Sequence, residues 1–273
     1  MGQPRALGQG ISRQGALTMK ALILTSNSLR HRYFTQVVAR CFDTPFVLVE
    51  EKKNYYVQQR DQSPVVCAHF ECIAAAEKLW FADATDATCP EMRQVGDINA
   101  PDLVASAERQ GVDVLCLFGT AILSQHWLDA FPRRIVNLHL GLSPFYRGSA
   151  TLFWPFVNRE LEYLGTTIHL ATAKVDAGEI LARIDPDLRS GETYYDITYR
   201  LIRDSIDCFP SKVSAYLEGR LRPVGQEDIA GRLYRKSDFT ELSLRQALGY
   251  VGAGLSEAEV KRIGVRRECR YLQ

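Results

Sequence analysis

The segment Val112-Asp-Val-Leu-Cys-Leu-Phe118 is a short, almost continuous apolar run, which is typical of a strand buried on both faces. A helix-like stretch over residues 103–110 comes directly before it. Similar apolar runs recur on both sides and predict further strands at 20–25, 46–49, 135–139, 165–170 and 180–184. Runs of this kind predict a sheet covered on both faces.

Helix-like stretches separate these runs, among them residues 68–82 and 193–217. Apolar residues recur with near-helical spacing over 193–217, but Pro210 is expected to kink or break that helix. Residues 26–28 (Ser-Asn-Ser) follow the first strand and are expected to cap the next helix, with a phosphate-binding site at the start of that helix as the alternative. Strands alternating with helices predict an α/β fold with a mostly parallel sheet, whose ligands bind at the carboxyl ends of the strands.

Composition and charge narrow the class of protein. The chain has 273 residues, of which 46% are hydrophobic and 24% charged, as in a soluble globular protein. Lys and Arg number 33 and Asp and Glu 32, and this near-neutral balance argues against a large nucleic-acid-binding surface. The seven scattered cysteines favour free thiols in a reducing, cytoplasmic compartment. No apolar run is long enough to span a bilayer and no signal-peptide pattern is present, so we expect no membrane association.

The stretch Cys67-Ala-His-Phe-Glu-Cys72 is a candidate metal site. His69 and Glu71 have the spacing of the zinc deaminase signature, but the later Pro-Cys-x-x-Cys is missing and residues 89–90 are a reversed Cys-Pro pair. A zinc site needs three or four ligands, and no second cluster is evident. We therefore expect no metal and interpret these cysteines as buried residues of a helix.

The most informative segment covers residues 136–148, with the sequence Val-Asn-Leu-His-Leu-Gly-Leu-Ser-Pro-Phe-Tyr-Arg-Gly. Asn137 and His139 end an apolar strand and share one of its faces, because side chains alternate along a strand. Polar groups at the end of a buried strand destabilise the fold unless they are paired. The segment is therefore a candidate functional site, and a turn with a hydrogen-bonded structural histidine is the alternative.

This segment resembles the formyltransferases that use 10-formyltetrahydrofolate. Their pattern is Asn-x-His, then a proline-containing loop, then Asp-x-Gly, and this chain has Asn137-Leu-His139, Gly141-Leu-Ser-Pro144 and Asp176-Ala-Gly178. The strand over 165–169 and the stretch over 118–123 match as well, so the resemblance covers about residues 20–190. It implies a Rossmann-like catalytic fold with a short C-terminal extension.

The resemblance also implies roles for individual residues. Asn137 and His139 would stabilise the charge that develops on the formyl oxygen, and Asp176 would orient His139. If His139 and Asp176 lie close together, their ion pair is expected to favour the charged imidazole. His169 is interpreted as a packed strand residue. The implied folate-binding residues are Phe118, Gly119, Thr120, Ile122, Leu123, Gly141, Leu142, Ser143, Pro144 and Gly178. Tyr146 and Arg147 would contact the acceptor, although Arg147 could instead pair within its own loop.

The implied activity is transfer of a formyl group from 10-formyltetrahydrofolate to the amine of a small acceptor. A nucleotide-linked amino sugar is the preferred interpretation. Gly141 and Ser143 stand where the family commonly has Ser and Leu, so the folate-binding loop is expected to differ in detail. The alternatives are a formyltetrahydrofolate hydrolase, a methionyl-tRNA formyltransferase and a noncatalytic α/β binding domain. The short C-terminal part and the near-neutral charge speak against tRNA.

Three parts of the chain are expected. Residues 1–18 are interpreted as a disordered extension before an internal start at Met19, residues 19–190 as the catalytic domain, and residues 191–273 as a C-terminal helix with a small α/β extension. The part from residue 223 onward could form a homodimer, cover the pocket or bind the acceptor. The sequence alone does not separate these roles.

Overall fold

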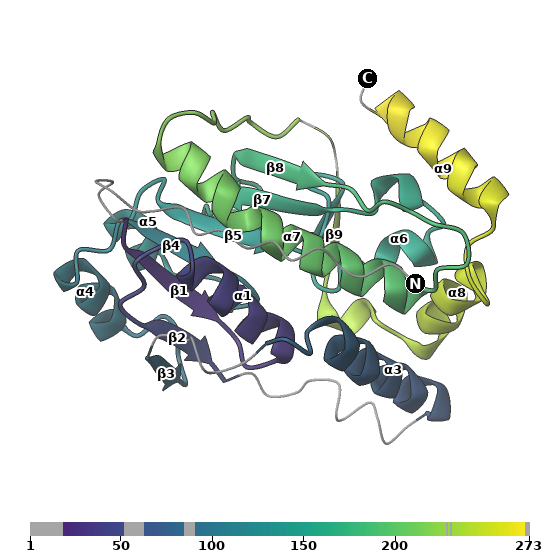
Figure 1. Cartoon of the computed structure of the whole chain (residues 1–273), viewed down its shortest axis with the longest axis horizontal. Helices are drawn as coiled ribbons and strands as arrows, with labels where there is room; N and C mark the ends of the chain where they lie inside the picture. The colour runs from purple at the N-terminus through teal and green to yellow at the C-terminus, as the bar shows by residue number, and fades with distance from the viewer. Residues whose placement is uncertain (1–18, 52–62, 85–90, 228, 230, 271–273) are drawn as a thin grey trace, which may run out of the picture.

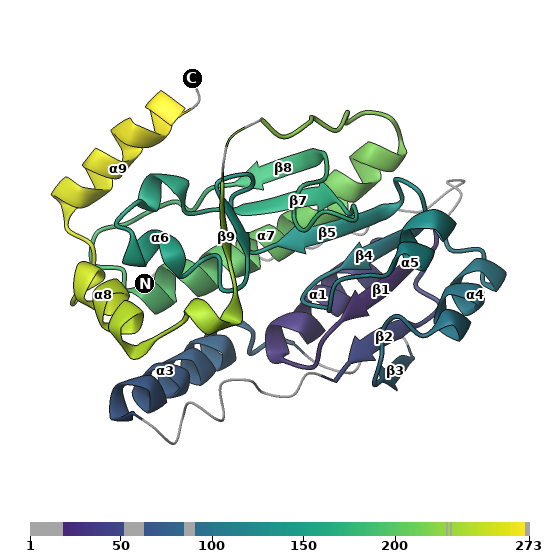
Figure 2. The same cartoon turned by 180° about the vertical axis from the view of Figure 1, so that it is seen from behind.

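The computed structural model describes residues 19–51, 63–84, 91–227, 229 and 231–270, so the extension expected over 1–18 lies outside the described residues. At its centre is a seven-stranded sheet with the order β3-β2-β1-β4-β5-β7-β8, as Figures 1 and 2 show. Strand β7 runs antiparallel to both of its neighbours, and the other pairings are parallel. The expected α/β fold with a mostly parallel sheet is therefore confirmed. The strands of this sheet are β1 (Ala21–Thr25), β2 (Val47–Glu50), β3 (Met92–Val95), β4 (Val114–Leu117), β5 (Ile135–His139), β7 (Thr166–Leu170) and β8 (Ile180–Ile184).

Helices cover both faces of the sheet (Figures 1 and 2). Alternation along β1 shows why, since Ala21 and Ile23 belong to one core cluster and Leu22 and Leu24 to the other. Each fully buried Ile or Leu side chain contributes about 1.5–3 kcal/mol to folding. One face packs against α1 (Leu29–Ala39) and α7 (Tyr194–Leu217), with α3 (Pro64–Trp80) resting on α7; the other face packs against α4 (Pro101–Arg109) and α5 (Gln125–Ala130).

Helix α7 continues through Pro210, so of the expected kink or break, the break does not occur. Proline has no N–H, and the helix therefore lacks the bond to the carbonyl of Ile206. The same stretch is buried, with Ile206, Phe209 and Val213 fully enclosed. Packing of α7 against β5, β7 and β8 offsets the missing hydrogen bond.

The part of the chain after α7 packs onto the same core. Strand β9 (Arg232–Tyr234) pairs in parallel with β6 (Tyr146–Gly148) to form a second, two-stranded sheet. Three residues of α8, Leu244, Ala247 and Val251, belong to the core cluster that also contains β5 and β7 residues. The remaining elements are α6 (Trp154–Val157), η1 (Leu161–Tyr163), η2 (Lys236–Asp238), α8 (Glu241–Val251) and α9 (Glu257–Arg270).

The six cysteines in the described part of the chain are free thiols. Cys67 is half-buried and Cys72 exposed, which corrects their interpretation as buried helix residues. The buried face of α3 consists instead of Val66, His69 and Ala76. Across the described ranges, no cluster of three or more His, Cys, Asp or Glu side chains has the geometry to hold a metal ion.

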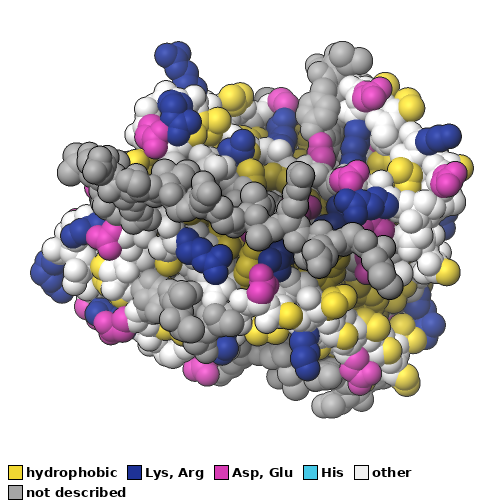
Figure 3. Space-filling view, viewed as in Figure 1, with side chains coloured by type: hydrophobic (Ala, Val, Ile, Leu, Met, Phe, Trp, Pro, Cys, Tyr) yellow, Lys and Arg dark blue, Asp and Glu magenta, His cyan; other side chains and the backbone are white. Residues whose placement is uncertain are grey.

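Two further properties concern large partners. Among the residues that the structure describes, no helix combines the length and the apolar character needed to cross a membrane. On the face shown in Figure 3, described Lys and Arg side chains are interspersed with Asp and Glu. Basic side chains on this face are therefore not gathered into one continuous patch.

Candidate active site

Strands β5 and β7 bring three polar side chains together. The antiparallel register places Asn137 directly opposite His169, and the Asn137 amide nitrogen lies 3.0 Å from His169 Nε2. His139 lies two residues further along the same face of β5. His169 is 3% exposed, as expected for a packed strand residue, but its ring belongs to the polar cluster. The sequence of residues 165–170 does not by itself place His169 in this cluster, because its position there depends on the antiparallel pairing of β7 with β5.

Asp176 completes the cluster from the connection between β7 and β8. Its Oδ1 lies 3.4 Å from His139 Nδ1 and 3.7 Å from His169 Nε2. Its Oδ2 accepts a hydrogen bond of 2.9 Å from the backbone N–H of Gly148. The backbone of Asp176 is left-handed, with φ +50°, which is uncommon for a residue other than glycine. The carboxylate is thus held between two imidazole rings.

The hydrogen-bond partners fix the tautomers of both rings. His169 Nδ1 donates to the carbonyl of Leu170 at 2.9 Å, which leaves Nε2 to accept from Asn137. His139 Nε2 donates to the carbonyl of Tyr146 at 3.0 Å, which leaves Nδ1 facing Asp176. A proton that arrives on Nδ1 of His139 would therefore meet a carboxylate.

Burial lowers the pKa of His139, while Asp176 opposes that shift and His169 adds to it. Asp176 favours the charged imidazole as expected, but burial outweighs it, and the net direction of the His139 pKa is down. The desolvation penalty of a charged imidazole is larger here than its electrostatic stabilisation by the carboxylate. Burial alone would raise the pKa of Asp176, but His139, His169 and the Gly148 N–H lower it to about 2. The resting site at neutral pH therefore holds a carboxylate beside a neutral His139.

The loop after β5 is shaped around His139. A Cβ atom on Gly141 would collide with His139 Nε2 and with the side chain of Thr151, which explains glycine where the family commonly has serine. The Thr167 hydroxyl donates to the Gly141 carbonyl at 2.7 Å and accepts from the Ser143 N–H at 2.9 Å. No local sequence pattern marks the contribution of Thr151 or Thr167. The loop is therefore fixed to β7, and its members Leu142, Ser143 and Pro144 are buried.

The loop after β4 contains the other residues expected to bind folate. Phe118 is 1% exposed and packs against Phe34, with ring centroids 5.3 Å apart, and Leu123 is 9% exposed. These two side chains therefore belong to the core. Ile122, in contrast, is 66% exposed. Together with the partly exposed Gly119 and Thr120, it offers an uncharged edge of backbone and apolar surface beside β5.

Tyr146 and Arg147, the expected acceptor contacts, are placed differently. The Tyr146 ring is 1% exposed and its hydroxyl donates to Glu160, so this residue reaches the site through its backbone carbonyl. Arg147 is partly exposed, and its Nε has no hydrogen-bond partner among the described residues. That Nε is buried, so only the partly exposed remainder of the Arg147 side chain is open to a ligand.

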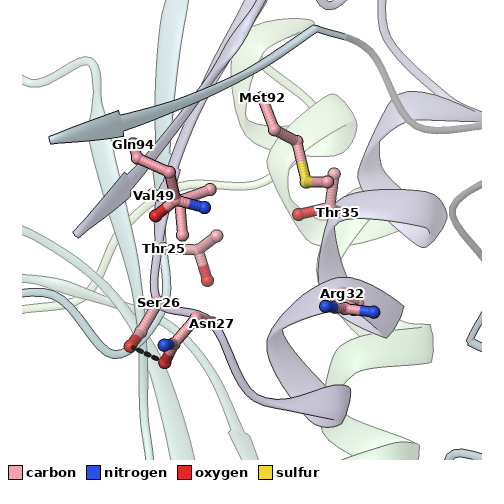
Figure 4. A pocket seen from close by; sticks show the side chains of 8 residues that line it. All are labelled: Thr25, Ser26, Asn27, Arg32, Thr35, Val49, Met92 and Gln94. Carbon is pink, nitrogen blue, oxygen red and sulfur yellow. Dashed lines mark hydrogen bonds between the residues drawn. The ribbon is translucent and has the colours of Figure 1, made fainter. Parts of the chain in front are cut away.

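A small pocket lies further along the same edge of the sheet, beyond β5 and β4. It is a hollow partly open to solvent and lies between α1 and the strands β1, β2 and β3 (Figure 4). Ser28 occupies the N-cap position of α1, but its hydroxyl pairs with His31 Nδ1 at 2.8 Å and not with a helix N–H. Ser28 therefore stands at the expected capping position, but its side chain does not cap the helix. The pocket is lined by Thr25, Ser26, Asn27, Arg32, Thr35, Val49, Met92 and Gln94.

Residues 38–213 match the formyl transferase family. A methionyl-tRNA formyltransferase from Roseiflexus sp. (strain RS-1) is 32% identical over 144 residues, which make up 51% of this chain and 41% of that protein. This chain thus spans about two fifths of the length of that relative.

Solved structures share the fold at low sequence identity. A sugar N-formyltransferase from Shewanella sp FDAARGOS_354 has a TM-score of 0.57 and 15% identity, covering 85% of this chain and 87% of that one. An N-formyltransferase from Helicobacter canadensis, in complex with folinic acid and dTDP-3-aminofucose, has a TM-score of 0.54 and 13% identity, covering 84% and 80%. At these identities the likeness concerns the fold alone.

Proposed function

This chain belongs to the formyl transferase family, and from that premise we propose that it transfers a formyl group from 10-formyltetrahydrofolate to the amine of a small acceptor. The carrying observation is the cluster of Asn137, His139, His169 and Asp176. The Asp176 carboxylate lies within 3.7 Å of a nitrogen on each imidazole ring. The His169 ring is also hydrogen-bonded to the Asn137 amide at 3.0 Å. The cluster thus combines a donor for developing negative charge with acceptors for a proton.

Bound 10-formyltetrahydrofolate supplies the formyl group. In this proposal its ring system lies against the loop after β4, where exposed backbone at Gly119 and Thr120 and the exposed Ile122 side chain suit a flat, uncharged, hydrogen-bonding ligand. Residues 171–176 would form the opposite wall. The complex of the Helicobacter enzyme with folinic acid supports a folate at this fold.

Asn137 is proposed to stabilise the oxygen that gains negative charge. Its side-chain nitrogen carries two hydrogens, and His169 takes one of them. The second remains for the substrate oxygen, and a donor of this kind lowers a barrier by about 3 kcal/mol. His139 is proposed to receive the proton that the acceptor amine loses as it bonds to the formyl carbon, and to pass that proton to the folate nitrogen as the bond from this nitrogen to the formyl carbon breaks. The proton would be held on Nδ1, where Asp176 faces it at 3.4 Å.

The acceptor is proposed to be a nucleotide-linked amino sugar. Arg147 supports an anionic acceptor, because this residue is partly exposed beside the site and a guanidinium binds phosphate well. The Helicobacter enzyme of this fold is complexed with dTDP-3-aminofucose. Methionyl-tRNA is the competing acceptor, because the Roseiflexus relative carries that name.

The proposal is tested by mixing the purified protein with 10-formyltetrahydrofolate and a panel of amines, chiefly amino-sugar nucleotides, with formylmethionyl-tRNA formation assayed in parallel. Tetrahydrofolate release is followed by absorbance and products by mass, with Asn137→Ala as the comparison. A formylated amino sugar whose formation falls about 100-fold in the variant is the expected result. Formate released without an acceptor would indicate the hydrolase. A protein that neither binds folate nor turns it over would instead be a noncatalytic binding domain.

A further inference from the structure

The segment that follows α7 reaches the active site at two places. We define the return segment as residues 222–234, of which 222–227, 229 and 231–234 are described. Its first half crosses β8, where Val224 and Ile180 exchange backbone hydrogen bonds of 2.7 and 2.9 Å. Its second half contains β9, which pairs with β6. This segment lies outside residues 38–213, the part that matches the family.

Gln226 makes the first contact with the site. Its amide nitrogen donates to the backbone carbonyls of Asp176 and Gly178, both at 2.8 Å. One side-chain amide therefore closes the turn in which Asp176 adopts its left-handed backbone. Such a conformation costs about 1–3 kcal/mol and persists only where its surroundings hold it. Bonds from both hydrogens of one amide supply that restraint.

Strand β9 makes the second contact, on the other side of the carboxylate. It pairs with β6, which ends at Gly148, the residue whose N–H binds Asp176 Oδ2. The Ser149 N–H donates to the Tyr234 carbonyl at 2.9 Å. A Cβ on Gly148 would collide with that same carbonyl, so the two backbones touch directly. Both the turn that presents Asp176 and the donor that binds it are thus fixed by the return segment.

We propose that Gln226 is a positioning residue for Asp176, and that the return segment holds the carboxylate in register with His139 and His169. The proposal rests on the proposed function for its kinetic consequence but not for its structural one. Gln226 does not touch the reacting atoms. It acts by keeping the Asp176 turn closed, and misplacing a reacting group by about 1 Å can cost on the order of 100-fold in rate.

Two substitutions separate hydrogen bonding from packing. Gln226→Ala removes both, whereas Gln226→Met keeps a side chain of similar length without a donor. We expect kcat to fall about 10- to 100-fold in both variants, with little change in KM for either substrate. Gln110→Ala is the control, since Gln110 is an exposed glutamine on the far side of the sheet and is expected to leave kcat unchanged. Native activity in Gln226→Met would overturn the proposal, because packing alone would then suffice.

A second readout does not depend on turnover. The chain has five histidines, and the NMR titration of the His139 imidazole is assigned with a His139→Gln variant. Asp176→Asn removes the negative charge that faces His139, so this variant gives the full change in the His139 titration that loss of the charge causes. We expect Gln226→Met to move the His139 titration in the same direction by a smaller amount. An unchanged titration would refute positioning by Gln226 even if activity fell. A shifted titration in a protein without formyl transfer would instead refute the proposed function and leave the positioning intact.

Discussion

His69 and His139 are buried to a similar degree, at 3% and 6% exposure, in two different regions of the molecule. His69 lies on α3 in an aromatic cage, with ring centroids 5.4 Å from Phe70 and 6.1 Å from Phe239. Its Nδ1 is hydrogen-bonded to the Tyr195 hydroxyl at 2.9 Å. His139 lies on β5, where its Nδ1 faces the carboxylate of Asp176.

The charged partner, and not the burial, separates the two histidines. Burial lowers the pKa of His69 to about 4, so this ring stays neutral at physiological pH. Burial also lowers the pKa of His139, but Asp176 opposes the shift. A proton that reaches His139 is therefore stabilised in place, whereas a proton on His69 would be isolated among rings. The same residue type serves packing in one region and, in the proposed reaction, proton transfer in the other.

Asp176→Asn removes the partner that makes His139 different from His69. We expect kcat to fall about 10²- to 10⁴-fold, because a proton on His139 would lose its counter-charge. Asp113→Asn is the control in the parallel half of the sheet, where Asp113 accepts from the Lys20 N–H at 2.8 Å. Steady-state kinetics at saturating substrates measures both variants. Activity above one tenth of native in Asp176→Asn would mean that His139 needs no carboxylate.

Exchanging each histidine for glutamine compares the two regions directly. His139→Gln is expected to lose about 100-fold in kcat, as for the loss of a general base. His69→Gln is expected to stay within about twofold, because His69 packs against α7 and the start of α8, away from the β5 cluster. Initial rates with circular dichroism as a folding check measure this pair. Equal losses in both folded variants would remove the distinction drawn between them.

Much of the fold could be predicted because β1, β4 and β5 are short, mainly apolar runs that are largely buried. Strand β3 was missed, since this edge strand alternates exposed and half-buried residues and contains no apolar run. The break at Pro210 was predicted from a local rule that packing of α7 overrides. Local chemistry thus indicated the buried elements and failed where tertiary contacts decide.

The candidate site divides in the same way. Asn137 and His139 could be selected because they end a buried strand, and Asp176 because its surroundings resemble the Asp-x-Gly part of the formyltransferase pattern. His169 joins them only through the antiparallel pairing of β5 with β7, which the sequence did not specify. Gln226 binds the Asp176 turn from 50 residues away, and no local pattern marks it. The direction of the His139 pKa depended on burial, which becomes known only with the fold.

The neutral cage of His69 predicts an acid-sensitive stability. Its folded pKa of about 4 lies below the unfolded value of about 6.5, so only the unfolded chain gains a proton between these values. The contribution of His69 to the free energy of unfolding is fully present above about pH 6.5. It falls by up to about 3 kcal/mol as the pH decreases to about 4 and then levels off. The contribution of Asp176 to stability is lost at lower pH, between about pH 4 and its folded pKa of about 2.

Urea unfolding at pH 7.5, 6, 5 and 4 measures this dependence as a difference between variants. His69→Gln is expected to flatten the slope of stability against pH in the upper window. His126→Gln is the control, because His126 is exposed and its substitution is expected to leave the slope unchanged. The idea fails if His69→Gln and the native protein lose stability in parallel.

The smallest effect is expected where the hydrogen bond of the caged histidine is removed without its packing. Tyr195→Phe leaves His69 Nδ1 without its partner at 2.9 Å and should lower the free energy of unfolding by about 1–2 kcal/mol. Tyr216→Phe removes the 2.8 Å bond to the Arg133 carbonyl at the surface, where water replaces it, and should cost less than about 0.5 kcal/mol. Urea denaturation at pH 7.5 measures both, and formyl-transfer activity should be unchanged in each. Equal small losses would mean that the rings alone keep His69 neutral, and the contrast with His139 would then rest entirely on Asp176.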